Sequence, residues 1–347
     1  MNAVILSGIG AIDKLVYTSI PTPQPKADEA SVKVEYCGIN HLDLLIRQGK
    51  RPGIPAFPHI LGSEIVGTIE KLHSNNDQFS TGGRVAIYPW TFCGKCTPCK
   101  SGNEQICDTG GTFGRTRWGG YTQYVTAPIK NLIKIPNMLP LDDVCAITLA
   151  GTTAHHLITR ANITEKSTVL VTGATGGVGT IVIQLLKNKK CTVVCTTSSK
   201  KKINTLKKLG VDYVVSTETI GSDVKKIFPD GVDFAIDMMG GIVWSQALTT
   251  LSKNGTMVFC ATTLDDPGIV NIGNAFSRQL NILGSYGGSR KDLKAALHLL
   301  KSGIIKPVIH SIYSLKDAPV AQQLLEKQKI FGKVLLSPAP SPTTSTS

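Results

Sequence analysis

The sequence is short of acidic residues. It holds 24 Asp and Glu against 37 Lys and Arg, which gives a formal net charge of +13 at pH 7. Such an excess of positive charge is typical of proteins that bind nucleic acids, acidic membranes or small polyanions. The lysines are scattered, however, and their densest groups, at 187–190, 200–202 and 207–208, fall on predicted helix ends and faces. A solvated surface explains most of them, so a nucleic-acid-binding protein stays the less favoured alternative. An acidic substrate or a polyphosphate cofactor would also profit from the charge.

A membrane span and a secretion signal are also missing from the sequence. The longest uncharged run, 167–186, contains the glycine-rich segment 172–179, which would break a helix in lipid. The first apolar stretch is interrupted by Gly8, Gly10 and Asp13, and no basic segment precedes it. The nine cysteines are an odd number, which fits a reducing compartment better than a disulfide framework. We therefore expect a cytoplasmic protein that does not interact with membranes.

Four of the cysteines stand in one short segment with the spacing C-x2-C-x2-C-x7-C. They are Cys93, Cys96, Cys99 and Cys107. Four thiolates fill every position of a tetrahedral Zn²⁺, so such a metal stabilises a loop and leaves no position for water or substrate. The alternatives are a redox disulfide pair or four unconnected buried thiols, but the interleaved Gly94, Lys95 and Pro98 are typical of an exposed loop. The spacing predicts one structural zinc ion in a lobe over about residues 90–110.

The length of 347 residues indicates two domains. Up to about residue 147, short alternating strands such as 31–36, 65–70 and 83–88 are separated by Gly and Pro and predict an antiparallel, barrel-like β domain. From residue 148 strands alternate with helices, which predicts a doubly wound parallel sheet. We expect the first domain to comprise 1–147 and 290–336, and the second to comprise 148–289. The Pro-, Ser- and Thr-rich residues 337–347 form a predicted flexible tail.

A glycine-rich turn joins the first strand of the second domain to an apolar helix predicted at 177–188. Glycines at this place permit the turn, let the backbone approach a pyrophosphate and allow close helix packing, while the helix start offers free N–H groups. The alternative is a glycine turn without a ligand. The predicted dinucleotide contacts in this turn are Gly173, Gly176, Gly177, Val178 and Gly179.

The end of the next strand carries no acidic residue. In NAD-binding sites an Asp or Glu at this place accepts hydrogen bonds from the adenosine ribose. Here the chain reads Cys195-Thr-Thr-Ser-Ser-Lys-Lys-Lys202, so that Thr196, Ser198 and Lys202 would hold a ribose 2′-phosphate. The sequence therefore favours NADPH over NADH, unless the lysines merely cover the start of the next helix.

Several motifs together resemble the medium-chain dehydrogenase/reductase superfamily, the group of alcohol dehydrogenases and quinone oxidoreductases. The resemblance extends over nearly the whole chain and implies a GroES-like β-barrel catalytic domain, a Rossmann domain and a homodimer or homotetramer, with the Rossmann sheet edge as an interface. The motifs are the four-cysteine lobe, the glycine turn and the segments 37–43, 61–67, 118–121, 150–154 and 331–334.

The sequence departs from the zinc-dependent members at the catalytic metal. The positions of the three usual ligands carry Asn40, Ser63 and Leu149, and Leu42 stands where those enzymes have a proton-relay hydroxyl. Leucine cannot coordinate zinc, and neutral amide and hydroxyl oxygens are poor substitutes for thiolate and imidazole. The resemblance thus implies hydride transfer from NADPH to an enone, enoyl thioester or quinone without catalytic zinc. A zinc alcohol dehydrogenase is the alternative.

Reduction of a conjugated bond needs hydrogen-bond donors at the oxygen that gains negative charge. The candidate catalytic donors are Asn40, Ser63 and Tyr88, with Trp90 as a wall of the substrate pocket. Each of these residues has a structural alternative, such as holding a turn or packing. Asp43 and Glu64 lie beside the substituted metal ligands, where they either orient their neighbours or act as an acid–base pair.

The resemblance also implies cofactor contacts outside the glycine turn. His41 matches a basic residue that meets the pyrophosphate, and Thr153 matches a nicotinamide contact. Ser198 and Lys202 match positions that receive the 2′-phosphate, and Lys333 is a further predicted cofactor contact. The adjacent His155 and His156 are expected on the polar side of a helix.

Overall fold

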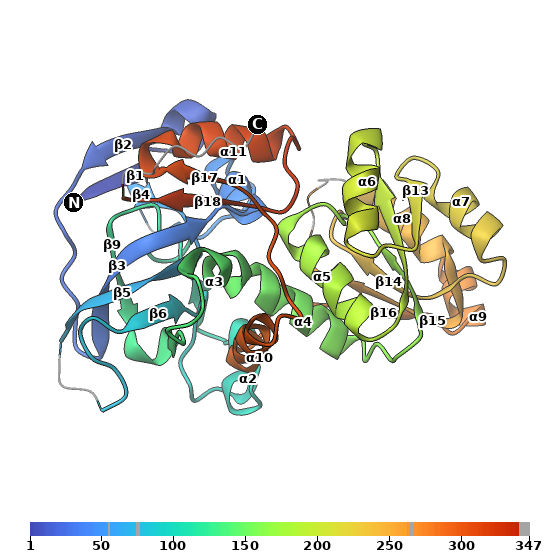
Figure 1. Cartoon of the computed structure of the whole chain (residues 1–347), viewed down its shortest axis with the longest axis horizontal. Coiled ribbons are helices and arrows are strands. Elements are labelled where there is room, and N and C mark those ends of the chain that lie inside the picture. The colour runs from blue at the N-terminus through green and yellow to red at the C-terminus, as the bar shows by residue number, and fades with distance from the viewer. Residues whose placement is uncertain (55, 74–76, 262, 264–266, 340–347) are drawn as a thin grey trace. The chain divides into compact units, whose positions relative to one another are not determined.

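The computed structural model describes residues 1–54, 56–73, 77–261, 263 and 267–339. Contacts divide the chain into two compact units, the first comprising Met1–Leu149 and the residues from Val308 onward, the second Ala150–Pro307 (Figure 1). The predicted discontinuous first domain thus has its counterpart in unit 1, but the return lies at Val308 rather than at residue 290. Residues 340–347 of the predicted tail lie outside the described residues, and Ser337 is the last residue of a strand.

The largest sheet of unit 1 has seven strands in the order β10-β6-β5-β3-β18-β17, with β9 pairing β3 as well. All pairs are antiparallel except the parallel pair of β17 and β18, which the expectation of an antiparallel barrel did not include. The strands are β3 (Glu29–Gly38), β5 (Glu64–Leu72), β6 (Arg84–Ile87), β9 (Tyr124–Pro128), β10 (Leu132–Lys134), β17 (Ile309–Ser314) and β18 (Lys333–Ser337).

Strand β3 forms because its apolar side chains alternate. Val32 and Val34 are buried, whereas Lys33 between them is exposed. The first half of this long strand pairs with β9, and Cys37 and Gly38 at its end pair with β18 from the far end of the sequence. Figure 1 shows the red C-terminal strands beside the blue N-terminal ones. This pairing brings Lys333, at the start of β18, to the segment that follows β3.

Smaller elements complete unit 1. Two small sheets have the orders β2-β1-β4 and β7-β8. Their strands are β1 (Asn2–Leu6), β2 (Leu15–Ser19), β4 (His59–Ile60), β7 (Trp90–Thr91) and β8 (Gly111–Thr112). The α-helices are α1 (His41–Arg47), α2 (Thr97–Lys100), α3 (Leu141–Thr148) and α11 (Ala318–Glu326), and the 3-10 helices are Ile12–Lys14, Glu104–Ile106, Ile129–Asn131 and Leu315–Asp317.

Unit 2 contains one parallel sheet in the order β13-β12-β11-β14-β15-β16. Its strands are β11 (Thr168–Val171), β12 (Thr192–Thr197), β13 (Tyr213–Ser216), β14 (Val232–Asp237), β15 (Leu251–Phe259) and β16 (Asn281–Gly284). From β11 the chain proceeds first toward β13 and then in the opposite direction toward β16. This is the predicted doubly wound topology, and ligands of such sheets bind at the carboxyl ends of the strands where the direction reverses, here between β11 and β14.

The helices of unit 2 are α4 (Ala150–Arg160), α5 (Gly177–Asn188), α6 (Lys200–Lys208), α7 (Ile220–Ile227), α8 (Gly241–Thr249), α9 (Ile272–Ser277) and α10 (Arg290–Lys301). Five of them, α5 to α9, connect the strands of the sheet, while α4 precedes the sheet and α10 follows it. Right-handed crossovers in the two opposite directions place the connecting helices on opposite faces of the sheet. Among the described residues, no helix combines the length and the apolarity that crossing a bilayer requires.

Helix α10 belongs to unit 2 because it is fixed to α4. The Asp292 carboxylate binds Nδ1 of His155 at 2.6 Å and Nδ1 of His156 at 3.0 Å, and it also accepts hydrogen bonds from the backbone and hydroxyl of Ser289. Burial by itself would raise the pKa of Asp292, but the bonds from the two histidines and from Ser289 hold that pKa well below its usual range. The histidines therefore join two helices instead of forming an unpaired polar face.

Candidate functional site

One buried carboxylate joins two of the three positions at which the sequence predicts replaced ligands of a catalytic zinc. These substituted positions are Asn40, Ser63 and Leu149. Asp43 Oδ2 accepts a hydrogen bond from the backbone N–H of Asn40 at 2.8 Å, and Oδ1 accepts one from the N–H of Gly62 at 3.0 Å. Because Gly62 directly precedes Ser63, this carboxylate fixes both segments relative to each other.

A second buried carboxylate, Glu64, reaches the third position. Its Oε1 accepts a hydrogen bond from the backbone N–H of Leu149 at 2.7 Å, and its Oε2 accepts one from Nδ2 of Asn40 at 3.1 Å. The Lys333 ammonium lies 2.5 Å from the same Oε2, and the two charged side chains are only 5% and 0% exposed. The structure thus brings all three substituted positions together around a buried ion pair.

The Lys333 ammonium uses its donors inside unit 1. Besides Glu64 it contacts the Ile39 carbonyl at 3.0 Å and Oδ1 of Asn40 at 2.8 Å, and an ammonium has three hydrogens to donate. These contacts favour a role in holding Glu64 and Asn40. The predicted contact of Lys333 with a cofactor stays a prediction.

The Asn40 amide is saturated as well. Its oxygen accepts from Lys333, and its nitrogen donates to Glu64 and to the Gly38 carbonyl at 3.3 Å. An amide nitrogen has two hydrogens, so neither is left for a substrate. This arrangement favours Asn40 as a residue that fills and holds the site, one of the two roles expected from the sequence.

The donors around this ion pair do not fit a catalytic zinc. Within the part of the chain that the structure describes, the only close group of three or more Cys, His, Asp or Glu ligand atoms is the four-cysteine cluster. At the substituted positions an ion would meet an amide, a hydroxyl and a leucine, beside a carboxylate that Lys333 already neutralises. Zinc prefers thiolate and imidazole, and a second cation next to this ammonium would be repelled.

Ser63 differs from its neighbours because its hydroxyl is not satisfied. The residue is 0% exposed, and its Oγ has no hydrogen-bond partner among the residues that the structure describes. A buried polar group without a partner costs about 1–3 kcal/mol, so such a group calls for an explanation. Of the predicted donors, Ser63 is therefore the one with a hydrogen left to give. Tyr88 is fully buried, and its ring lies 5.4 Å from that of Trp90, in keeping with a wall of packed aromatic side chains.

Two titratable groups near the ion pair have shifted pKa values. Burial raises the pKa of Asp43 to about 6, although the N–H groups of Asn40 and Gly62, the Lys333 charge and a hydrogen bond from Tyr121 act in the opposite direction. At the start of α1, the pKa of His41 is lowered, first by partial burial and then by the Lys333 charge. His41 keeps contact with solvent despite its crowded surroundings, and its predicted contact with a pyrophosphate stays a prediction.

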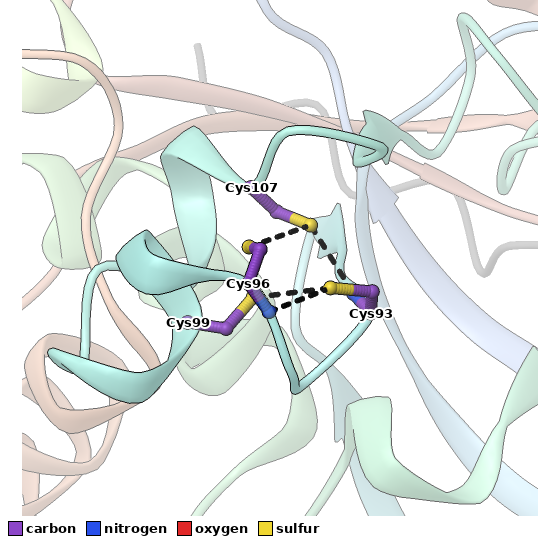
Figure 2. Close-up of side chains that lie close together, drawn as sticks. All are labelled: Cys93, Cys96, Cys99 and Cys107. Atoms are coloured by element: carbon purple, nitrogen blue, oxygen red, sulfur yellow. Dashed lines mark hydrogen bonds between the residues drawn. The ribbon is translucent and has the colours of Figure 1, made fainter.

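The four cysteines of the lobe converge as the spacing predicted (Figure 2). The sulfurs of Cys93 and Cys99 lie 4.0 Å apart, those of Cys96 and Cys107 lie 3.8 Å apart, and all four lie within 4.8 Å of one another. Four sulfurs at about 2.3 Å from a tetrahedral zinc are about 3.8 Å from one another. The cluster therefore has the dimensions of a zinc site.

The thiols of the lobe need a cation to ionise together. Backbone N–H groups of Lys95 and Cys96 lower the pKa of Cys93 to about 6, whereas burial and then the neighbouring sulfurs raise the pKa of Cys99 to about 12. Although burial raises it, hydrogen bonds from the backbone N–H groups of Cys93 and Thr109 lower the pKa of Cys107 as well, so the four thiols do not ionise alike. A zinc ion offsets the repulsion between neighbouring thiolates, and it would fix the loop between β7 and β8.

The glycine turn after β11 has the geometry of a phosphate-binding loop. Gly173 has a φ of +65°, which L side chains rarely adopt. A Cβ on Gly179 would lie 2.5 Å from the Gly173 carbonyl oxygen, so only glycine packs here. A Cβ on Gly176 would meet only that same oxygen, at 3.5 Å. The chain itself does not require glycine at 176, whereas a ligand that approaches the backbone does. Gly177 and Val178 begin α5, whose free N–H groups suit an anion.

The end of β12 keeps the polar side chains expected from the sequence. Thr196 is buried, Ser198 is exposed, and Lys202 lies half-buried in the first turn of α6, where burial lowers its pKa. Thr153 is buried in α4. Two residues of this site were not predicted from the sequence. Tyr121 donates a hydrogen bond to Asp43, and Gln322 donates one to the Tyr121 hydroxyl. Tyr121 lies in a recognised motif, but no sequence signal connects either residue with Asp43.

Comparisons with known proteins agree with this architecture. The family model of the alcohol dehydrogenase GroES-like domain matches residues 26–137, and that of the zinc-binding dehydrogenases matches residues 177–302. An NAD-dependent alcohol dehydrogenase of Sulfolobus acidocaldarius is 31% identical, covering 97% of this chain and 99% of the relative. An acryloyl-coenzyme A reductase of Sulfurisphaera tokodaii is 30% identical, covering 97% of this chain and 100% of the relative.

Solved structures show the same similarity. A cobalt- and zinc-bound thermostable alcohol dehydrogenase from Pyrobaculum aerophilum superimposes with a TM-score of 0.90 at 29% identity, covering 97% of this chain and 99% of that one.

Replacing Cys96 by Ser removes one thiolate from the lobe. We expect the variant to lose its zinc and to unfold at a lower temperature, since a structural zinc contributes directly to folding. Calorimetry and metal analysis measure both effects. Cys191→Ser, a substitution outside the lobe, is the control and keeps the metal. A Cys96→Ser protein that retains stoichiometric zinc would contradict the assignment.

The two glycines 176 and 179 provide a matched pair of substitutions. Gly176→Ala meets no atom of the chain closer than 3.5 Å, so the variant should fold normally and bind NADPH at least tenfold more weakly, because the new methyl group occupies the path of the pyrophosphate. Gly179→Ala should destabilise the fold by about 1–3 kcal/mol through overpacking. Thermal unfolding and fluorescence titration distinguish them. Unchanged nucleotide affinity in folded Gly176→Ala would count against this loop as the cofactor site.

Proposed function

Because the chain belongs to the medium-chain dehydrogenase/reductase superfamily, we propose that it is an NADPH-dependent reductase of activated C=C bonds or quinones that works without a catalytic zinc. The observation that carries the proposal is the Lys333–Glu64–Asn40 cluster at the substituted positions. It provides a positive charge from the chain itself and leaves no set of zinc ligands. Its substrate is a small molecule: an enone, an enoyl thioester or a quinone.

The chemistry of such substrates fits what the site retains. Bound NADPH supplies the hydride, which adds to the electron-poor carbon while the conjugated oxygen gains negative charge. That oxygen needs a hydrogen bond, and the unsatisfied hydroxyl of Ser63 is our candidate for the donor. Asn40, Asp43 and Glu64 hold the segments around Ser63 in position, and a proton from solvent completes the reduction. Tyr88 and Trp90 are proposed to shape the pocket.

An enoyl thioester is the favoured substrate among these classes. The relative that is 30% identical carries the name acryloyl-coenzyme A reductase, and acryloyl-coenzyme A is an enoyl thioester. The formal net charge of +13 would also attract the phosphates of such an ester. Other relatives carry the name alcohol dehydrogenase. Alcohol oxidation is therefore the alternative function, and the absence of thiolate and imidazole at positions 40, 63 and 149 speaks against its zinc-dependent form.

NADPH is proposed as the cofactor on the basis of the residues that follow β12. Hydroxyl groups and the half-buried Lys202 would bind a 2′-phosphate, and no carboxylate between 195 and 202 would repel it. Three of the relatives are named as NAD-dependent, so the proposed preference for NADPH rests on the side chains of this chain alone.

The edge of the unit 2 sheet is a proposed homodimer interface. Strand β16 is the last strand of that sheet, and α9 precedes it with two strongly exposed apolar side chains, Ile272 at 75% and Phe276 at 74%. Ile282 on β16 itself is 38% exposed. Two copies related by a two-fold axis would pair their edge strands and cover these side chains.

The function is tested by NADPH oxidation with a quinone, an enone, an enoyl thioester and a simple aldehyde, each product being identified by NMR. We expect a saturated C–C bond or a hydroquinone, with rates that a chelator of loosely bound metal does not change. With NADH in place of NADPH, kcat/KM should be about tenfold lower or more. In the Lys202→Ala variant, the ratio of kcat/KM with NADPH to kcat/KM with NADH should be smaller than in the wild-type protein. Ser63→Ala should lower kcat about 100- to 1000-fold, the range for loss of one oxyanion donor.

Two results of this assay would contradict the proposal. Reduction of the aldehyde alone, abolished by the chelator, would favour the zinc alcohol dehydrogenase. An equal kcat/KM with NADH would refute the cofactor preference while leaving the reaction type intact.

The interface is tested with Phe276→Asp. We expect the wild-type protein to have the mass of two or four chains by light scattering and the variant to dissociate into smaller species, because two carboxylates would be buried face to face. Val320→Asp, at another exposed apolar residue, is the control and leaves the mass unchanged. A monomeric wild-type protein would refute the interface.

A further inference from the structure

A chain of buried polar side chains leads from the surface of α11 to Asp43. Arg47 Nε donates to Oε1 of Gln322 at 2.9 Å, Nε2 of Gln322 donates to the Tyr121 hydroxyl at 3.4 Å, and that hydroxyl donates to Oδ2 of Asp43 at 3.2 Å. At its outer end, Arg47 pairs with the partly exposed Glu326 at 3.2 Å. We call these residues the polar chain.

The polar chain is costly to bury. Asp43, Tyr121 and Gln322 are 0% exposed and Arg47 is 2% exposed. Polar groups in a protein interior are tolerated only when they are hydrogen-bonded, and apolar residues of the same size are often equally stable or more so. A buried network of this kind fixes one arrangement of the groups that it connects. What the polar chain fixes therefore depends on the groups that lie at its inner end.

The inner end of the polar chain lies at the segments that carry Asn40 and Ser63. Each Asp43 oxygen accepts one backbone N–H, from Asn40 or from Gly62, and the Tyr121 hydroxyl adds a third hydrogen bond. Gln322 holds the Tyr121 hydroxyl from α11, an element far away in the sequence. A shift of Asp43 would move both segments at once, because one carboxylate binds both.

We propose that Tyr121 and Gln322 are positioning residues for the reduction, since they hold Asp43 so that the segments of Asn40 and Gly62 keep Ser63 in the position that the substrate oxygen requires. The inference rests on the proposed function for the role of Ser63, but the connection between Tyr121 and Asp43 is independent of it. Tyr121 and Gln322 act through Asp43 and do not touch the substrate.

The groups around Asp43 determine the sign of the pH effect. Burial raises the pKa of Asp43 to about 6, and the hydrogen bond from Tyr121 and the charge of Lys333 lower it. Burial is the main cause that raises the pKa values of the neighbouring Tyr121 and Cys37, and the Asp43 charge adds to it, so both groups are neutral at pH 7. The ionised carboxylate accepts all three hydrogen bonds, so the site is complete above pH 6. Loss of the Tyr121 hydroxyl removes a bond that favours ionisation, so the pKa of Asp43 must rise.

The experiment compares the wild-type protein with Tyr121→Phe and Gln322→Met. In the variants, we expect the acid limb of the kcat profile to move to higher pH, with about tenfold lower kcat below pH 6 and an unchanged KM for NADPH, since one pKa unit is a tenfold change in ionised fraction. Carboxyl NMR of 13C-labelled protein, assigned with Asp43→Asn, should show the same upward shift. Tyr17→Phe, on the exposed side of β2, is the control and should change neither.

The acid limb and the Asp43 titration distinguish a positioning role of Tyr121 and Gln322 from a purely structural one. A lower melting temperature with an unmoved acid limb and an unmoved Asp43 titration would overturn the inference. If no substrate is turned over, the proposed function fails, while the carboxyl titration still tests the connection from Tyr121 to Asp43. If Tyr121→Phe does not fold, Gln322→Met provides the same two readouts.

Discussion

The buried ion pair of Lys333 and Glu64 is the interaction on which the rest of the site depends. A carboxylate that is 0% exposed cannot remain charged without a partner, and here the partner is an ammonium of the same chain. The charged Glu64 then binds both Asn40 and the backbone of Leu149. Without the ammonium, the segments that carry these residues would lose their common point of attachment.

We propose separate roles for the two places where this scaffold could hold a metal. The lobe keeps four sulfurs at the spacing of a tetrahedral zinc, a ligand set that would hold a loop and leave no position for a substrate. At positions 40, 63 and 149, for which the sequence predicts replaced zinc ligands, two buried carboxylates and an ion pair hold the segments together. A reaction that develops charge on a conjugated oxygen needs an ordered site and a donor, but it does not need a Lewis acid.

The sequence predicted the features that depend on local patterns. Helix α5 begins and ends at the predicted residues, Gly177 and Asn188, because the glycine turn and the apolar periodicity define it. The cysteine spacing predicted the lobe for the same reason. The return to the first domain was placed too early, because the attachment of α10 to α4 depends on Asp292 meeting His155 and His156, more than 130 residues away.

The pairing inside the site was not predictable for the same physical reason. Lys333 reaches Asn40 across 293 positions of the chain, and Gln322 reaches Tyr121 across 201. These contacts exist only because β18 pairs with β3 and α11 packs in the same unit, which no local pattern reveals. The substitution of the metal ligands was visible in the sequence, whereas the network that takes their place was not.

If the charges of Lys333 and Glu64 take the place of a catalytic metal, the purified protein should hold zinc at the four cysteines alone, so its zinc content is the first quantity to measure. Mass spectrometry of the intact folded protein, together with elemental analysis after removal of loosely bound metal, gives the number of zinc ions per chain. We expect one zinc ion per chain, held by the four cysteines. Two tightly bound zinc ions per chain, one of them remaining when the lobe cysteines are replaced, would contradict this expectation.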